Sequence, residues 1–83
     1  MPTMQQVSEI VDKVRTRLKD AESDGVYLKV VDERLDDDWL YIVVAPTRPG
    51  VRASDHARLM SRVERELRQQ GDDKVLLVPA IED

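Results

Sequence analysis

The sequence predicts an α+β fold, a two-layer sandwich of the order α-β-β-α-β with two helices packed on one face of a three-stranded sheet. Two patterns predict it. In two segments apolar residues recur at spacings of three and four, which is typical of amphipathic helices, and three shorter segments are rich in residues that favour strands. Because the chain has 83 residues, we expect one small domain over residues 1–83. Two layers would bury the apolar side of each element.

The first helix is predicted over residues 4–21. Thr3 followed by Gln6 fits a capping box, in which each side chain accepts the backbone N–H of the other residue. The apolar stripe that would face the sheet consists of Val7, Ile10, Val11, Val14, Leu18 and Ala21. The Ser-Asp-Gly sequence at residues 23–25 predicts the end of the helix and a turn.

Residues 26–31 and 39–45 are predicted as the first two strands because they are rich in β-branched and aromatic residues. Residues 32–38 carry five carboxylates in seven positions, and we expect them to form the polar turn of an antiparallel hairpin. Alternate residues of the second strand are expected to lie under the helices: Leu40, Ile42 and Val44.

The second helix is predicted to begin at Ser54, a good N-cap, and to run to about Gln70, with Gly71 as its end. Its apolar stripe consists of Leu59, Met60, Val63 and Leu67. Residues 74–78 form the predicted third strand, which Pro79 ends. This strand lies either beside the first strand, antiparallel, or beside the second, parallel, and the pattern leaves both arrangements open.

The second strand lacks the alternation of apolar and polar residues that is typical of a strand with one solvent-exposed face. All seven of its residues are apolar or aromatic. The side chains expected on the face away from the helices are Tyr27, Val31, Trp39, Tyr41 and Val43, joined by either Val75 and Leu77 or Leu76 and Val78. Large exposed apolar patches mark interfaces, and Trp and Tyr often anchor them. We therefore expect a non-enzymatic protein-interaction module that forms a homodimer through this face. An unidentified protein partner is an alternative occupant.

The second hypothesis is a module that binds nucleic acid or phosphate. Tyr27, Trp39 and Tyr41 would stack on bases, and arginines near the start of the second helix would hold an anion. The candidates for that anion site are Arg48, Arg52, Arg58 and Arg62. Carboxylates beside these arginines can pair with them, and the net charge of −4 disfavours binding by bulk electrostatics. We rank this hypothesis below self-association and do not expect nucleic acid as a partner.

The chain offers few groups for catalysis, with one histidine, no cysteine and no glycine-rich phosphate loop. The acidic residues 32–38 lack the calcium-loop pattern. We expect no enzymatic activity, no metal and no cofactor. No apolar run approaches the ~20 residues of a membrane span, and the N-terminus lacks the pattern of a signal peptide. We therefore expect a soluble, cytoplasmic protein without a membrane partner.

The predicted element order is similar to that of the RNA-binding KH type II modules and of the small ring-building domains of secretion systems. KH modules hold RNA with a G-x-x-G loop. The nearest match, Arg48-Pro49-Gly50-Val51, has one of the two glycines. The similarity therefore concerns the element order alone and implies no function.

Overall fold

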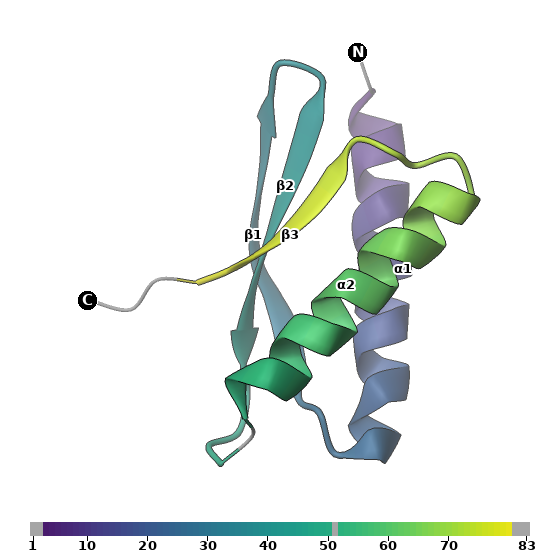
Figure 1. Ribbon diagram of the computed structural model, residues 1–83. Helices are drawn as coiled ribbons and strands as arrows, with labels where there is room; N and C mark the ends of the chain where they lie inside the picture. Colours follow the sequence, from purple (N-terminus) through teal and green to yellow (C-terminus); the bar gives the residue numbers. More distant parts are fainter. Residues whose placement is uncertain (1–2, 51, 81–83) are drawn as a thin grey trace.

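The computed structural model describes residues 3–50 and 52–80, and both helices lie on one side of a three-stranded sheet (Figure 1). This arrangement confirms the predicted fold class. The elements are α1 (Met4–Ala21), a short 3-10 helix (Glu22–Asp24), β1 (Leu28–Asp36), β2 (Trp39–Pro46), α2 (Ala53–Gln69) and β3 (Val75–Pro79).

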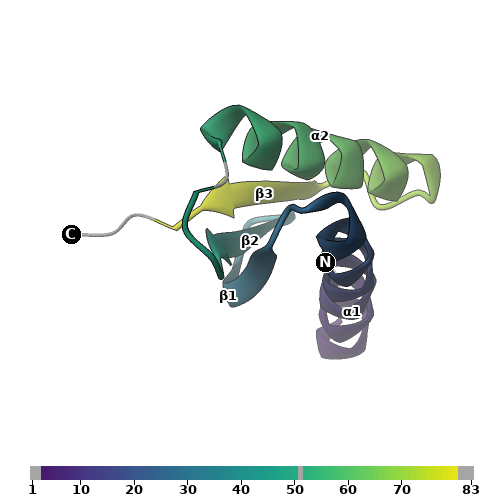
Figure 2. The ribbon, with the colours of Figure 1, turned by 90° about the horizontal axis from the view of Figure 1, so that it is seen from below.

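The strand order is β1-β2-β3, so β2 is the central strand. β1 pairs with β2 antiparallel, as the predicted hairpin requires, and β3 pairs with β2 in parallel. This pairing decides between the two positions that the sequence left open for the third strand. α1 packs against β1 and α2 against β3. The two helices therefore cover different halves of the same sheet face (Figure 2).

The core lies between the helices and the sheet, and it contains the predicted stripes. Ile42 and Val63 are fully buried, and Leu40 and Val44 each expose 2% of their surface. These residues confirm which face of β2 lies under the helices. The buried cluster as a whole comprises Val11, Val14, Leu18, Ala21, Leu28, Leu40, Ile42, Val44, Leu59, Val63, Leu67, Val75 and Leu77.

The two helices begin differently. At α1 the predicted capping box is present, because the Gln6 N–H donates to Thr3 Oγ1 at 3.1 Å and the Thr3 N–H donates to Gln6 Oε1 at 2.7 Å. At α2 the predicted N-cap is wrong. The helix begins at Ala53, its N-cap is Arg52, and no side chain caps it. The Arg52 carbonyl already accepts the N–H groups two and three residues beyond Ala53, which places Ser54 inside the first turn.

Gly71 ends α2 as predicted. It has a positive φ of 93°, which glycine adopts without a steric penalty. The Asp72 N–H donates to the Leu67 carbonyl at 2.9 Å, and the Gly71 N–H donates to the Arg68 carbonyl at 3.0 Å. These two bonds make a Schellman motif, which satisfies the last carbonyls of the helix.

β1 is longer than predicted. It continues to Asp36, so that Asp36 lies opposite Trp39 and the hairpin turn contains only Asp37 and Asp38. The expected seven-residue polar turn is therefore wrong. Backbone pairing with β2 satisfies the N–H and C=O groups of this stretch that face β2, and an edge strand tolerates exposed carboxylates. Asp37 has a φ of 54°, a region that aspartate enters more readily than most residues.

A β-bulge interrupts β1 in its middle. Val30 lies opposite Val44 and Asp32 opposite Val43, so Val31 is the extra residue between them. A bulge adds one residue to a strand and thereby reverses the alternation of the residues that follow. The faces assigned from simple alternation hold for the start of β1 and fail beyond Val31.

The outer edge of β3 is partly closed by α2. The Leu77 N–H donates to Glu64 Oε1 at 2.9 Å. Every second residue of a parallel strand points its backbone groups away from its neighbour, and Lys74 and Ala80 bond to β2. Leu77 and Pro79 therefore belong to the outward set. Pro79 has no N–H, and the Leu77 N–H is satisfied by the carboxylate of Glu64.

Replacing Glu64 by alanine is expected to lower the free energy of unfolding by about 1–3 kcal/mol, because a half-buried N–H loses a charged acceptor. Urea unfolding followed by circular dichroism measures this change. The matched control is Glu64→Gln, which keeps an acceptor oxygen and should lose less than the alanine variant. Equal losses in the two variants would mean that the bond to Leu77 contributes little.

Candidate interaction surface

Neither helix covers the second face of the sheet (Figure 2). Directly opposed residues of neighbouring strands share a face. The register therefore sorts this open face into four rows, which are Lys29–Ala45, Asp32–Val43–Val78, Arg34–Tyr41–Leu76 and Asp36–Trp39. β2 and β3 contribute the apolar side chains of these rows, and β1 contributes the charged ones.

The apolar half of the open face consists of Trp39, Tyr41, Val43, Leu76 and Val78. Trp39 exposes 37% of its surface, and the other four are half-buried. All five come from neighbouring strands in consecutive rows, so they form one continuous area. Three of the five predicted interface residues, Trp39, Tyr41 and Val43, are thus brought together. Of the two pairs that β3 could have contributed, Leu76 and Val78 is the one on this face. All five side chains face away from both helices.

The charged half of the open face is a strip along β1 formed by Lys29, Asp32, Arg34 and Asp36. Of these four, simple alternation from Tyr27 places only Lys29 on this face. The other three were assigned to a turn, and simple alternation across Val31 would also have placed them on the wrong face. Leu35, the one apolar residue between Arg34 and Asp36, is the sequence signal that could have indicated a longer strand.

The two remaining interface candidates, Tyr27 and Val31, are not among the five side chains of the apolar half. Tyr27 precedes β1, and the Arg48 guanidinium lies 4.2 Å from the centre of its ring. This cation–π contact covers one face of the ring. Val31 is the bulge residue and exposes 46% of its surface.

The four anion-site candidates do not line one common groove. Arg58 and Arg62 line a groove of about 690 Å³ together with Arg65, Asp24 and Asp55. Arg48 and Arg52 are not among the residues that line it. The groove lies along α2, which packs on the other side of the sheet from the aromatic face. Its arginines and carboxylates are mixed, which is typical of a solvated helix face.

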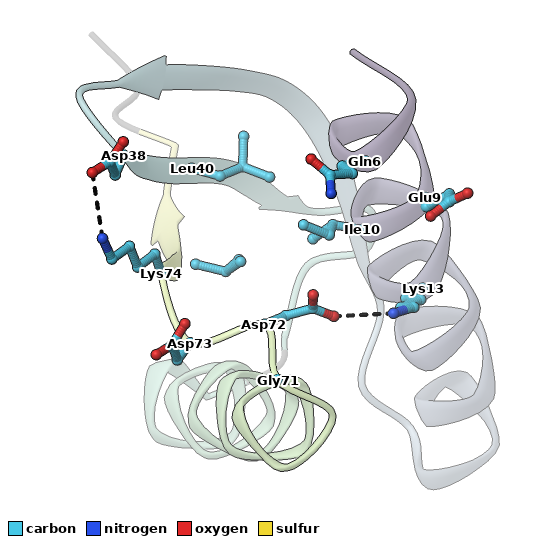
Figure 3. Close-up of a pocket in the computed structure, with 11 residues that line it drawn as sticks. Gln6, Glu9, Ile10, Lys13, Asp38, Leu40, Gly71, Asp72, Asp73 and Lys74 are labelled. Carbon is cyan, nitrogen blue, oxygen red and sulfur yellow. Dashed lines mark hydrogen bonds and ion pairs between the residues drawn. The ribbon is translucent and has the colours of Figure 1, made fainter. Parts of the chain in front are cut away.

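A polar pocket of about 470 Å³ opens between α1, the hairpin turn and the connection from α2 to β3 (Figure 3). Its two lysines are already paired. Lys13 Nζ lies 3.0 Å from Asp72 Oδ2, and Lys74 Nζ lies 3.4 Å from Asp38 Oδ2. The remaining polar groups of the lining include the carboxylates of Glu9 and Asp73. Because each lysine pairs with a carboxylate from another segment, we interpret this pocket as a junction that links three segments.

His56 lies on α2 beside a groove of about 350 Å³ that Met60, Leu77 and Pro79 also line. Its Nε2 atom is buried and has no hydrogen-bond partner among the described residues. The carboxylate in the lining, that of Glu64, already accepts the N–H of Leu77. The groove therefore lacks the chain of hydrogen bonds that a histidine needs as a general base.

Within residues 3–50 and 52–80, no group of three or more His, Cys, Asp or Glu residues has an arrangement that could hold a metal ion. In the same part of the chain, neither helix is long and apolar enough to cross a membrane. No protein-family model, curated protein or solved structure matches this chain. The open face is the surface from which we infer a function, because it gathers partly exposed aromatic and apolar side chains.

Proposed function

We propose that this chain is a non-enzymatic self-association module, and that two copies pack through the open face of the sheet. The observation that carries the proposal is the apolar half of that face, which lies opposite both helices. It places a partly exposed tryptophan, Trp39, beside Tyr41 on the central strand. Aromatic residues at the centre of a patch are the residues that most often dominate binding energy.

Self-association also fits the energetics of a domain of this size. Burial of apolar area stabilises by ~25 cal/mol per Å², and a chain of 83 residues with no phenylalanine and no cysteine has a small core and no disulfide. Association adds buried area and stabilises the folded chain by mass action. A second copy needs no partner of matching abundance, so it is the simplest occupant of this surface.

Binding of single-stranded nucleic acid is the lower-ranked alternative. Trp39 and Tyr41 would offer stacking platforms. The strip beside them, however, carries two cations and two carboxylates, so it gives no net attraction for phosphates. The arginine groove lies along α2, in the other layer of the sandwich.

Light scattering of the purified chain is expected to give twice the mass of the monomer at micromolar concentrations. Trp39 is the single tryptophan, so its fluorescence reports on this face alone. Iodide should quench it poorly at high protein concentration and more strongly on dilution, because the dimer buries it. A monomer at high micromolar concentration whose Trp39 is freely quenched would overturn the proposal.

A further inference from the structure

The open face has a regular spacing along the strand direction. Residues of β1 lie opposite Ala45, Val43, Tyr41 and Trp39, which are every second residue of β2. The bulge at Val31 brings Lys29 into this series, although two residues, Val30 and Val31, lie between it and Asp32. The rows are therefore about 7 Å apart, at ~3.4 Å per residue. Along β1 the charges then read plus, minus, plus, minus.

This order of charges is complementary to its own reverse. When the strip is turned end for end and laid over a second copy, Lys29 meets Asp36 of the second copy, and Asp32 meets Arg34. The reverse contacts then follow by symmetry. Every charge thus faces a charge of opposite sign. Electrostatic complementarity of this kind fixes the register of an interface and disfavours other arrangements.

The apolar half is complementary under the same operation. The centre of the face lies between the row of Val43 and the row of Tyr41. Rotation about this centre places Trp39 over Ala45 of the other copy, and Tyr41 over Val43. In β3 it places Leu76 over Val78. Each large side chain on β2 therefore faces a smaller one, which is what close packing of two sheets requires.

We infer that the partner of this surface is a second copy turned by a two-fold axis that lies in the plane of the interface, perpendicular to the strands. The axis passes between the rows of Asp32 and Arg34. The inference rests on the proposed self-association and adds its geometry, in which β1 faces β1 and β3 faces β3 of the partner. Sheets packed face to face lie ~10 Å apart, a gap that an arginine and an aspartate side chain together can bridge.

The competing two-fold axis runs along the strands through β2. It would lay the charged strip of each copy over Leu76 and Val78 of the other. Asp32 and Arg34 of each copy would then lose water without gaining a partner, which is strongly unfavourable. In the described residues, none of the four charges of the strip forms a salt bridge within the chain. They are therefore available to a second copy.

The test exchanges charges at the two positions nearest the axis. Arg34→Asp places carboxylates opposite carboxylates twice per dimer, and Asp32→Arg does the same with guanidinium groups. Each single variant is expected to raise the dimer dissociation constant about tenfold or more at low salt. The double variant Asp32→Arg/Arg34→Asp should return it to near the parent value. Mixing the two single variants should give a heterodimer of near-parent affinity, because each then supplies the charge that the other needs.

Sedimentation equilibrium of the full chain at low and high salt measures these constants, and circular dichroism checks that each variant is folded. A parent dimer whose constant does not change in any of the four samples would overturn the geometry and leave self-association standing. Weakened single variants with no recovery in the double variant or the mixture would also overturn it. A monomeric parent would remove both proposals.

Discussion

Replacing Ile42 by alanine is expected to lower the free energy of unfolding by about 2–5 kcal/mol, because its side chain is fully buried and leaves a cavity. Ile42 lies on the central strand, between Leu40 and Val44, where both helices close over the sheet. The neighbouring side chains are held by their own packing and can collapse only partly into the space. Urea unfolding at fixed protein concentration measures the change.

The matched control for this variant is Val31→Ala. Val31 lies on the neighbouring strand and is also β-branched, but it exposes 46% of its surface. Its replacement is expected to change the free energy of unfolding by less than about 0.5 kcal/mol, as exposed positions usually do. Similar losses in the two variants would contradict the assigned core. If Ile42→Ala instead dissociated an otherwise stable protein, the two faces of β2 would have been assigned the wrong way round.

Replacing Tyr41 by alanine is expected to weaken the dimer by about 2 kcal/mol or more, which is a rise of about 30-fold in the dissociation constant. Tyr41 occupies the middle of the open face, with Arg34 on one side and Leu76 on the other. Truncation removes the largest contact next to the proposed axis. The folded subunit should keep its helical circular dichroism, because Tyr41 points away from the helices.

Tyr41→Phe is the control, since it keeps the ring and loses only the hydroxyl group. It should keep most of the parent affinity. Loss of the dimer also lowers the melting temperature by mass action, so the melting of each variant is measured over a range of protein concentrations. A Tyr41→Ala variant with the mass and the concentration dependence of the parent would show that the open face is not an interface.

Local patterns predicted the parts of this fold that depend on local chemistry. The stripe of α1 became its buried side, and Val14 and Leu18 are in the core. Gly25 and Gly71 mark turns because both have positive φ, a region that few other residues enter without strain. The two faces of β2 could be separated because Leu40 and Ile42 differ by two residues, the period of a strand.

The set of residues on the open face depends on how the strands pair, and local sequence patterns do not reveal strand pairing. Asp32, Arg34 and Asp36 have low strand propensity as a group, yet their backbone groups pair with β2 and hold them in a strand. A bulge is a property of two strands together, so one strand alone does not reveal Val31 as the extra residue. The parallel position of β3 likewise follows from how α2 packs on the sheet.

The closure of the β3 edge limits how large an assembly of this chain can become. Sheets that recruit further chains do so through unpaired backbone groups on an edge strand, and the products are open-ended fibrils. On the β3 edge, Glu64 already occupies the Leu77 N–H, and Pro79 has none to offer. On the β1 edge, the bulge and the alternating charges disfavour a regular ladder. Growth by strand addition is therefore disfavoured on both sides. In the proposed dimer a single partner occupies the sheet face, so such an assembly would stop at a finite size.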